Sequence, residues 1–145
     1  MLAETMSTLP FSPVREIEGW VYLAGQGGFD DDGKLGDTIE EQTEQTLRNV
    51  ERLLDEHGCS MRDVVSCLVH LTDLDGLAAY NEVYVRHFAE PRPVRTTVGA
   101  RLIGDMLVEI TAVARRPWRA LRIASIRSHL PIFERPGMPF ALATS

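Results

Sequence analysis

Cysteine is scarce in this chain of 145 residues, which contains only Cys59 and Cys67. Their spacing fits neither a metal-binding motif nor a disulfide framework, so we expect two reduced thiols. The four histidines also lack the spacing of metal ligands. The sequence therefore predicts no metal site, and Cys67, within a strand pattern, is expected to belong to the core and not to act as a nucleophile.

Long apolar runs are absent too. No stretch approaches the length that a helix needs to cross a bilayer. Residues 1–13 have neither the basic start nor the apolar centre of a signal peptide. We therefore expect a cytoplasmic protein that has no membrane partner.

Positive charge is deficient over most of the chain, whose net charge is −6. Residues 1–114 hold 9 Lys and Arg against 20 Asp and Glu, a net charge of −11, whereas residues 115–145 hold 6 Arg and 1 Glu, a net charge of +5. An acidic body lacks the basic surface that binds phosphate backbones. No nucleic-acid partner is expected.

Hydrophobic periodicity predicts two helices among several strands. The first helix is expected to begin after Thr38, because Thr38 and Glu41 have the spacing of a capping box, and to end before Gly58. The helices are expected at residues 39–57 and 77–88, and the clearest strands at residues 18–26, 63–74, 94–102 and 106–114. The order β, β, α, β, α, β, β predicts an α+β sandwich of two layers, with both helices on one face of a mixed sheet.

Arg95 is unexpected in its surroundings. It lies in the β-branched stretch "PVRTTVGARL", which has the composition of a strand. A cation that is buried without a partner costs several kcal/mol. We therefore expect an anion to face Arg95.

The last two strands are expected to form a hairpin. With Gly99 opposite Glu109 and Arg95 opposite Val113, their apolar residues face the helices together. Arg95, Thr97 and Glu109 then share the face away from the helices. This arrangement allows two interpretations: a structural ion pair, or a site in which the arginine binds a carboxylate and Glu109 holds a water or moves a proton.

Five motifs, in their order along residues 10–114, resemble the RidA (YjgF) family. They are Gly-Gln after a strand, a helix with Gln-Thr pairs, "HLTD" at a strand end, "NEVY" in a helix and "RTTV" in a strand. The resemblance implies a chorismate-mutase-like fold of the bacillary type. It also implies a homotrimer with a central barrel of sheets and three clefts between subunits.

The resemblance further implies an enzyme that hydrolyses 2-enamino and 2-imino acids to 2-oxo acids and ammonia without a cofactor. Arg95 would bind the carboxylate of a small substrate, with help from Asn81 and a backbone group of Thr97. Glu109 would hold the attacking water, and Gly25 would line the cleft. Arg95 and Glu109 are thus the expected catalytic residues.

Two positions depart from the family pattern. Ala24 stands where a serine is usual, and Phe11 stands where deaminating members have a tyrosine, so two hydroxyl groups are lost from the cleft. These losses favour a less polar or larger substrate, such as an aminomuconate-like enamine. A non-catalytic trimer that senses carboxylates is the alternative from another class, and a ribonuclease role is disfavoured by the acidic charge.

The family-like domain is expected to span residues 1–114. Residues 115–145 form a basic and apolar extension, which we expect to pack on its own body or on a neighbouring subunit. A frayed extension is the alternative.

Overall fold

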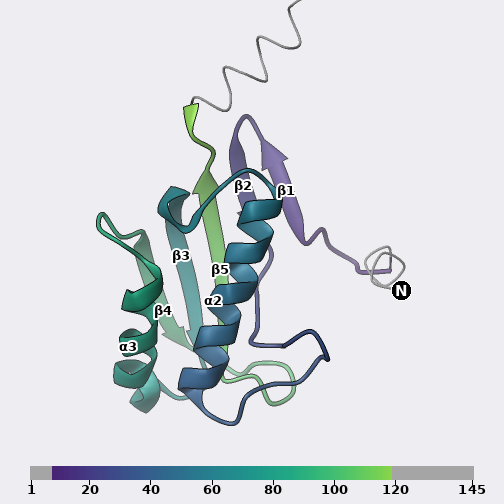
Figure 1. Cartoon of the computed structure of the whole chain (residues 1–145). Helices are drawn as coiled ribbons and strands as arrows, with labels where there is room; N and C mark the ends of the chain where they lie inside the picture. Colours follow the sequence, from purple (N-terminus) through teal and green to yellow (C-terminus); the bar gives the residue numbers. More distant parts are fainter. Residues whose placement is uncertain (1–7, 119–145) are drawn as a thin grey trace, which may run out of the picture.

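The computed structural model of the protein describes residues 8–118 (Figure 1). Within them, five strands form one sheet, and two α-helices lie side by side on one of its faces. The elements are β1 (Val14–Ile17), β2 (Trp20–Leu23), α2 (Ile39–Glu56), η1 (Met61–Asp63), β3 (Val64–Leu71), η2 (Leu74–Gly76), α3 (Leu77–His87), β4 (Val94–Gly99) and β5 (Val108–Arg115). The two-layer α+β sandwich and the order of its elements are confirmed.

The predicted cytoplasmic location and the predicted C-terminal extension are not tested by the described residues. No helix in residues 8–118 has the length and apolarity to cross a bilayer, and the cytoplasmic location stays a prediction. Nearly all of the predicted C-terminal extension, from residue 119 on, lies outside the described residues. The division of the chain into a domain and an extension therefore also stays a prediction.

The sheet has the strand order β1-β2-β5-β3-β4. Strands β3 and β4 run parallel, and all other neighbours are antiparallel. The parallel pair arises because α3 returns the chain across the sheet between β3 and β4, as a crossover connection requires. Strand β3 thus lies between β4 and β5, and the hairpin predicted for the last two strands is wrong.

Helix α2 begins and ends as its sequence predicts. Thr38 Oγ1 accepts a hydrogen bond from the backbone N–H of Glu41 at 3.2 Å, and the Glu41 carboxylate accepts one from the N–H of Thr38 at 3.3 Å. This capping box satisfies two N–H groups that have no partner inside the helix. At the other end Gly58 has a φ of 72°, a left-handed conformation that glycine adopts without steric cost.

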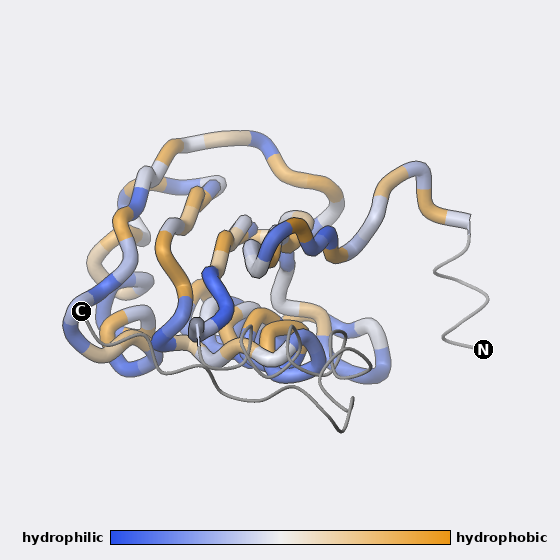
Figure 2. Tube along the Cα trace, turned by 90° about the horizontal axis from the view of Figure 1, so that it is seen from above, coloured by the Kyte–Doolittle hydropathy of each residue, from blue (hydrophilic) through white to orange (hydrophobic). Residues whose placement is uncertain are grey.

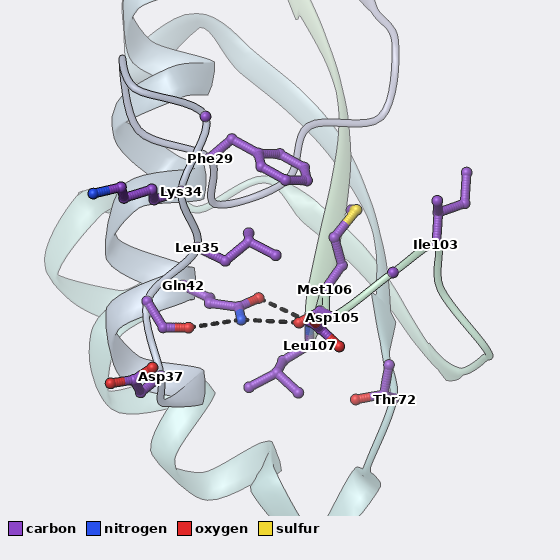
Figure 3. A pocket seen from close by; sticks show the side chains of 13 residues that line it. Phe29, Lys34, Leu35, Asp37, Gln42, Thr72, Ile103, Asp105, Met106 and Leu107 are labelled. Carbon is purple, nitrogen blue, oxygen red and sulfur yellow. Dashed lines mark hydrogen bonds between the residues drawn. The ribbon is translucent and has the colours of Figure 1, made fainter.

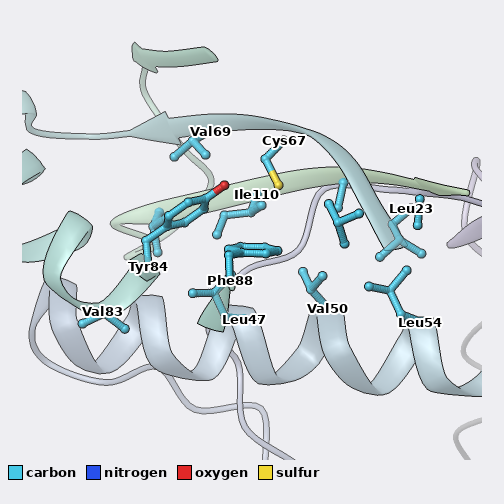
Figure 4. Packing of buried hydrophobic residues seen from close by; sticks show 14 of the residues in the cluster. Leu23, Leu47, Val50, Leu54, Cys67, Val69, Val83, Tyr84, Phe88 and Ile110 are labelled. Carbon is cyan, nitrogen blue, oxygen red and sulfur yellow. The ribbon is translucent and has the colours of Figure 1, made fainter. Parts of the chain in front are cut away.

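The core lies between the two helices and the inner face of the sheet (Figure 4). Leu47 and Val50 of α2 are fully buried against Val69 of β3 and Ile110 of β5. Alternate residues of β5 point inward, so that Val108, Ile110, Ala112 and Ala114 are all inaccessible to solvent. This alternation puts Glu109 and Thr111 on the opposite, outer face.

The outer face of the sheet is apolar but uncovered in the described part of the chain. Tyr22, Leu68, Val94 and Val98 are 45%, 39%, 69% and 37% exposed. Figure 2 shows that apolar residues (orange) occur along the strands as well as along the helices. The prediction that Val94 and Val98 face the helices is therefore wrong, because the parallel pairing with β3 turns them outward. Exposed apolar side chains that gather on one face are typical of an interaction surface.

A charged contact joins the two helices: His87 Nε2 of α3 lies 2.8 Å from Glu44 Oε2 of α2. This hydrogen bond lowers the pKa of Glu44 below its usual value, although burial opposes the shift. A carboxylate whose folded-state pKa is lowered adds stability above its unfolded pKa of 4.5, and that stability is lost as the pH falls through the folded value.

We predict that Glu44→Gln lowers the free energy of unfolding by about 0.5–1 kcal/mol at neutral pH. The difference from the wild type should shrink as the pH falls below 4.5. Urea denaturation at several pH values measures both quantities, with Glu51→Gln on the exposed side of α2 as the matched control. An effect of equal size at every pH would show that the Glu44 charge does not contribute.

Candidate functional site

Four of the predicted site residues line one hollow of about 610 Å³. Phe11 comes from the segment before β1, Ala24 and Gly25 follow β2, and Glu109 is the second residue of β5. Resemblance alone had placed these residues in a common cleft, and the structure brings them together.

The backbone that follows β2 forms one side of this hollow. Beyond the end of β2, the chain stays paired with β5 through two hydrogen bonds: Gln26 N–H donates to Ile110 O at 2.8 Å, and Ile110 N–H donates to Gln26 O at 3.0 Å. The Glu109 carboxylate lies directly over Gly25, where any Cβ atom would collide with it. Gly25 is therefore required for the position of Glu109.

Two buried amides of α2 hold the loops around the hollow. Asn49, 8% exposed, donates from Nδ2 to the carbonyls of Gly27 and Phe29, both at 2.9 Å. Gln42, 2% exposed, donates from Nε2 to Gly36 O at 2.9 Å and to Asp105 O at 3.1 Å (Figure 3). It also accepts from the N–H of Leu107 at 2.8 Å.

These contacts frame a second hollow of about 930 Å³, shown in Figure 3. Phe29, Ile103 and Met106 line both hollows and so separate them. The sequence analysis missed the roles of Gln42 and Asn49. The signal that could have revealed them is an uncharged amide at a helix position that faces the rest of the protein, because such a group requires a hydrogen-bond partner when buried.

Arg95 lies elsewhere, on the inner side of β4. Its neighbour in the parallel ladder is Cys67, so its side chain points toward α3. The guanidinium carbon lies 4.7 Å from the centre of the Tyr84 ring and 5.4 Å from that of Tyr80. Cation–π contacts of this kind partly replace the hydration that a half-buried arginine loses.

Among the described residues, Arg95 has no carboxylate partner. The hydroxyl groups of Tyr80, Tyr84 and Thr97 are buried near it. Arg95 interacts with the hydroxyl of Tyr80, and the Cys67 thiol with that of Tyr84. Burial raises the pKa of both tyrosines, so they stay neutral at physiological pH. Asn81, also predicted for the site, lies half-buried in α3 next to Tyr80.

Arg95 and Glu109 therefore occupy opposite faces of the sheet. The predicted arrangement, in which Arg95, Thr97 and Glu109 share the outer face, is wrong within one subunit. In the parallel ladder Arg95 and Thr97 lie beside the inward residues Cys67 and Val69, whereas Glu109 pairs with His70 and points outward. The error follows directly from the hairpin, which would have put β4 beside β5.

The cysteines are structural. Cys59 and Cys67 are 5% and 1% exposed, and burial raises the pKa of both thiols. A thiol with a raised pKa forms little of the thiolate that acts as a nucleophile. In residues 8–118, no group of three or more His, Cys, Asp or Glu is placed to hold a metal ion.

The mixed five-stranded sheet with two helices on one face places the protein in the class of two-layer α+β sandwiches. Comparison with known proteins identifies its family. The family model described as Endoribonuclease L-PSP matches residues 1–116. A RutC family protein from Pyrococcus abyssi is 38% identical over 109 residues, which cover 72% of this chain and 85% of the relative. The protein belongs to this family, to which the names RidA and YjgF are also applied.

Solved structures agree with this assignment. RidA from the Antarctic bacterium Psychrobacter sp. PAMC 21119 has 34% sequence identity and a TM-score of 0.72, with 74% of this chain and 89% of the other chain covered. TdcF from E. coli, solved with bound serine, has 30% identity and a TM-score of 0.72, with 75% and 90% covered.

We predict that Asn49→Ala lowers the free energy of unfolding by about 1–3 kcal/mol, because two partly buried carbonyls lose their donor. Amide hydrogen exchange in residues 25–30 should accelerate more than exchange in α3. Glu51→Ala, on the exposed side of the same helix, is the matched control. Unchanged exchange in residues 25–30 would show that Asn49 does not hold this loop.

Proposed function

We propose that the protein hydrolyses 2-enamino and 2-imino acids to 2-oxo acids and ammonia. The observation that carries the proposal is Arg95, a half-buried cation without a carboxylate partner in the described residues. The buried hydroxyls of Tyr80, Tyr84 and Thr97 lie in the same region. A substrate carboxylate would supply the missing anion.

The proposed active site is shared between subunits of a homotrimer. Strand β4, which carries Arg95 and Thr97, is an edge strand, and the outer face of the sheet is apolar and uncovered in residues 8–118. Packing of three such faces into a central barrel would bury this surface. It would also allow Arg95 of one subunit to approach Glu109 of the next, although the two residues are separated by the sheet within each subunit.

The chemistry requires few groups. An enamine first tautomerises to the imine, water adds to the imine carbon, and the C–N bond of the resulting carbinolamine breaks to release ammonia and the 2-oxo acid. Arg95 binds the carboxylate through two parallel hydrogen bonds, and Thr97 and Asn81 fix its orientation. Glu109 takes a proton from the attacking water and returns it to the leaving nitrogen.

The relatives support a small amino-acid-like ligand. The structure of TdcF contains serine, which carries both a carboxylate and an amine. The description of the family model names an endoribonuclease activity, but residues 1–114 carry a net charge of −11. An acidic body repels RNA phosphates, so we favour the deaminase.

We predict that Arg95→Ala lowers kcat/KM by about 100-fold, because the substrate loses its anchor. Glu109→Gln should lower kcat by at least about 100-fold with little change in KM, because it removes the proton acceptor. An amino-acid oxidase that generates imines, coupled to detection of the 2-oxo acid, measures both variants. Arg86→Ala, which removes an exposed cation of α3, is the matched control.

Two results would contradict the proposal. If the wild type accelerates the hydrolysis of no imine but binds carboxylates through Arg95, the protein is a ligand sensor. If Arg95→Ala retains the wild-type rate, the carboxylate is bound elsewhere.

A further inference from the structure

We propose that the hollow beside Glu109 contains a subsite for a large apolar side chain. The substrates are then 2-imino and 2-enamino acids with branched aliphatic or aromatic side chains, in preference to small or hydroxylated ones. This inference rests on the proposed deaminase function and names the substrate class for the same site.

The wall of the hollow is apolar and open. Phe11, Phe29 and Ile103 line it and are 56%, 42% and 86% exposed. Large apolar side chains that are exposed around a concave surface are typical of binding sites. In this hollow they surround the same space as the Glu109 carboxylate, so a substrate held at Glu109 has this wall within reach of its side chain.

Two glycines in the lining leave room for apolar side chains beside Glu109. A Cβ atom at Gly27 would lie 2.7 Å from Met106 Cε and 3.2 Å from Phe29 Cε2. In their present positions, Met106 and Phe29 therefore pack against the backbone of residue 27, which is two residues from Gly25, over which the Glu109 carboxylate lies.

Three polar side chains of the hollow, those of Gln26, Asp30 and Asn49, already make hydrogen bonds within the protein. The Asn49 amide donates to two carbonyls, and the Gln26 amide donates to Ala24 O at 2.8 Å. Asp30 Oδ1 accepts from the backbone N–H groups of Asp32 and Lys34 at 2.9 and 2.8 Å. A hydroxylated substrate side chain would thus lose hydrogen bonds to water and find few replacements here.

Two other residues of the lining have the same effect. Ala24 presents a methyl group and Phe11 an unsubstituted ring on this hollow, so neither offers a hydroxyl to a substrate side chain. One cation, Arg52, lies at the rim and pairs with Asp31 at 3.5 Å. A distal carboxylate on the substrate would have to compete with this pair, whereas an apolar group would not.

The test compares imines derived from alanine, leucine and phenylalanine in the coupled assay. For the wild type we expect kcat/KM to be at least about tenfold higher for the leucine and phenylalanine derivatives, the lower end of what added methylenes contribute in a hydrophobic pocket. Ile103→Ser should reduce this ratio to about threefold or less. Val85→Ser, which changes an exposed aliphatic residue of α3 outside both hollows, should leave it unchanged.

A binding measurement separates failure of the subsite from failure of the proposed function. Calorimetry with pyruvate, 4-methyl-2-oxopentanoate and phenylpyruvate should show tighter binding of the two larger acids, and Ile103→Ser should remove the difference. If no imine is hydrolysed but this pattern holds, the subsite stands and the deaminase does not. Equal rates for all three imines, a preference for the alanine derivative, or equal affinities would overturn the subsite.

Discussion

The position of β3 between β4 and β5 determines which residues of this protein can meet. Because α3 crosses from the end of β3 to the start of β4, these two strands run parallel, and Arg95 lies beside Cys67 on the inner face. Strand β5 pairs antiparallel on the other side of β3, and Glu109 points outward. No rotation of either side chain can bring the two groups together through the sheet.

Because Arg95 and Glu109 lie on opposite faces of the sheet, each subunit has two half-sites, one around each residue. Around Arg95, two aromatic rings and several buried hydroxyls surround a cation that has no carboxylate partner in residues 8–118. Around Glu109, two glycines and an apolar wall leave a carboxylate beside a hollow. Each half-site lacks the charged group that the other provides. In the proposed trimer, the apolar side chains that are exposed on the outer face of the sheet in residues 8–118 form the surface that brings the two half-sites of different subunits together.

Local patterns predicted most of the fold. The capping box of α2 and the alternation of β5 are properties of neighbouring residues, so the sequence contains them directly. The pairing of β4 was predicted wrongly, because alternation in a strand is equally compatible with a hairpin and with a crossover. Choosing between them requires the path of α3, which is a long-range property.

The candidate site was likewise predicted only in part. Phe11, Ala24, Gly25 and Glu109 were expected together and lie together. Arg95, Thr97 and Asn81 lie apart from them within one subunit. The wrong hairpin had put Arg95 and Thr97 on the same face as Glu109, and the family resemblance had added Asn81. Gln42 and Asn49 were missed, since a buried amide that anchors a loop leaves no periodic pattern in the sequence.

The most direct test of a site shared between subunits is complementation. Arg95→Ala and Glu109→Gln subunits, each inactive alone, would be unfolded together, refolded as a mixture and assayed for imine hydrolysis. In a cyclic trimer with random mixing, about a quarter of the wild-type activity should return, because each mixed trimer has one cleft with both residues intact. Refolding to mixed trimers without any return of activity would contradict the account, because it would show that Arg95 of one subunit and Glu109 of another do not form one site.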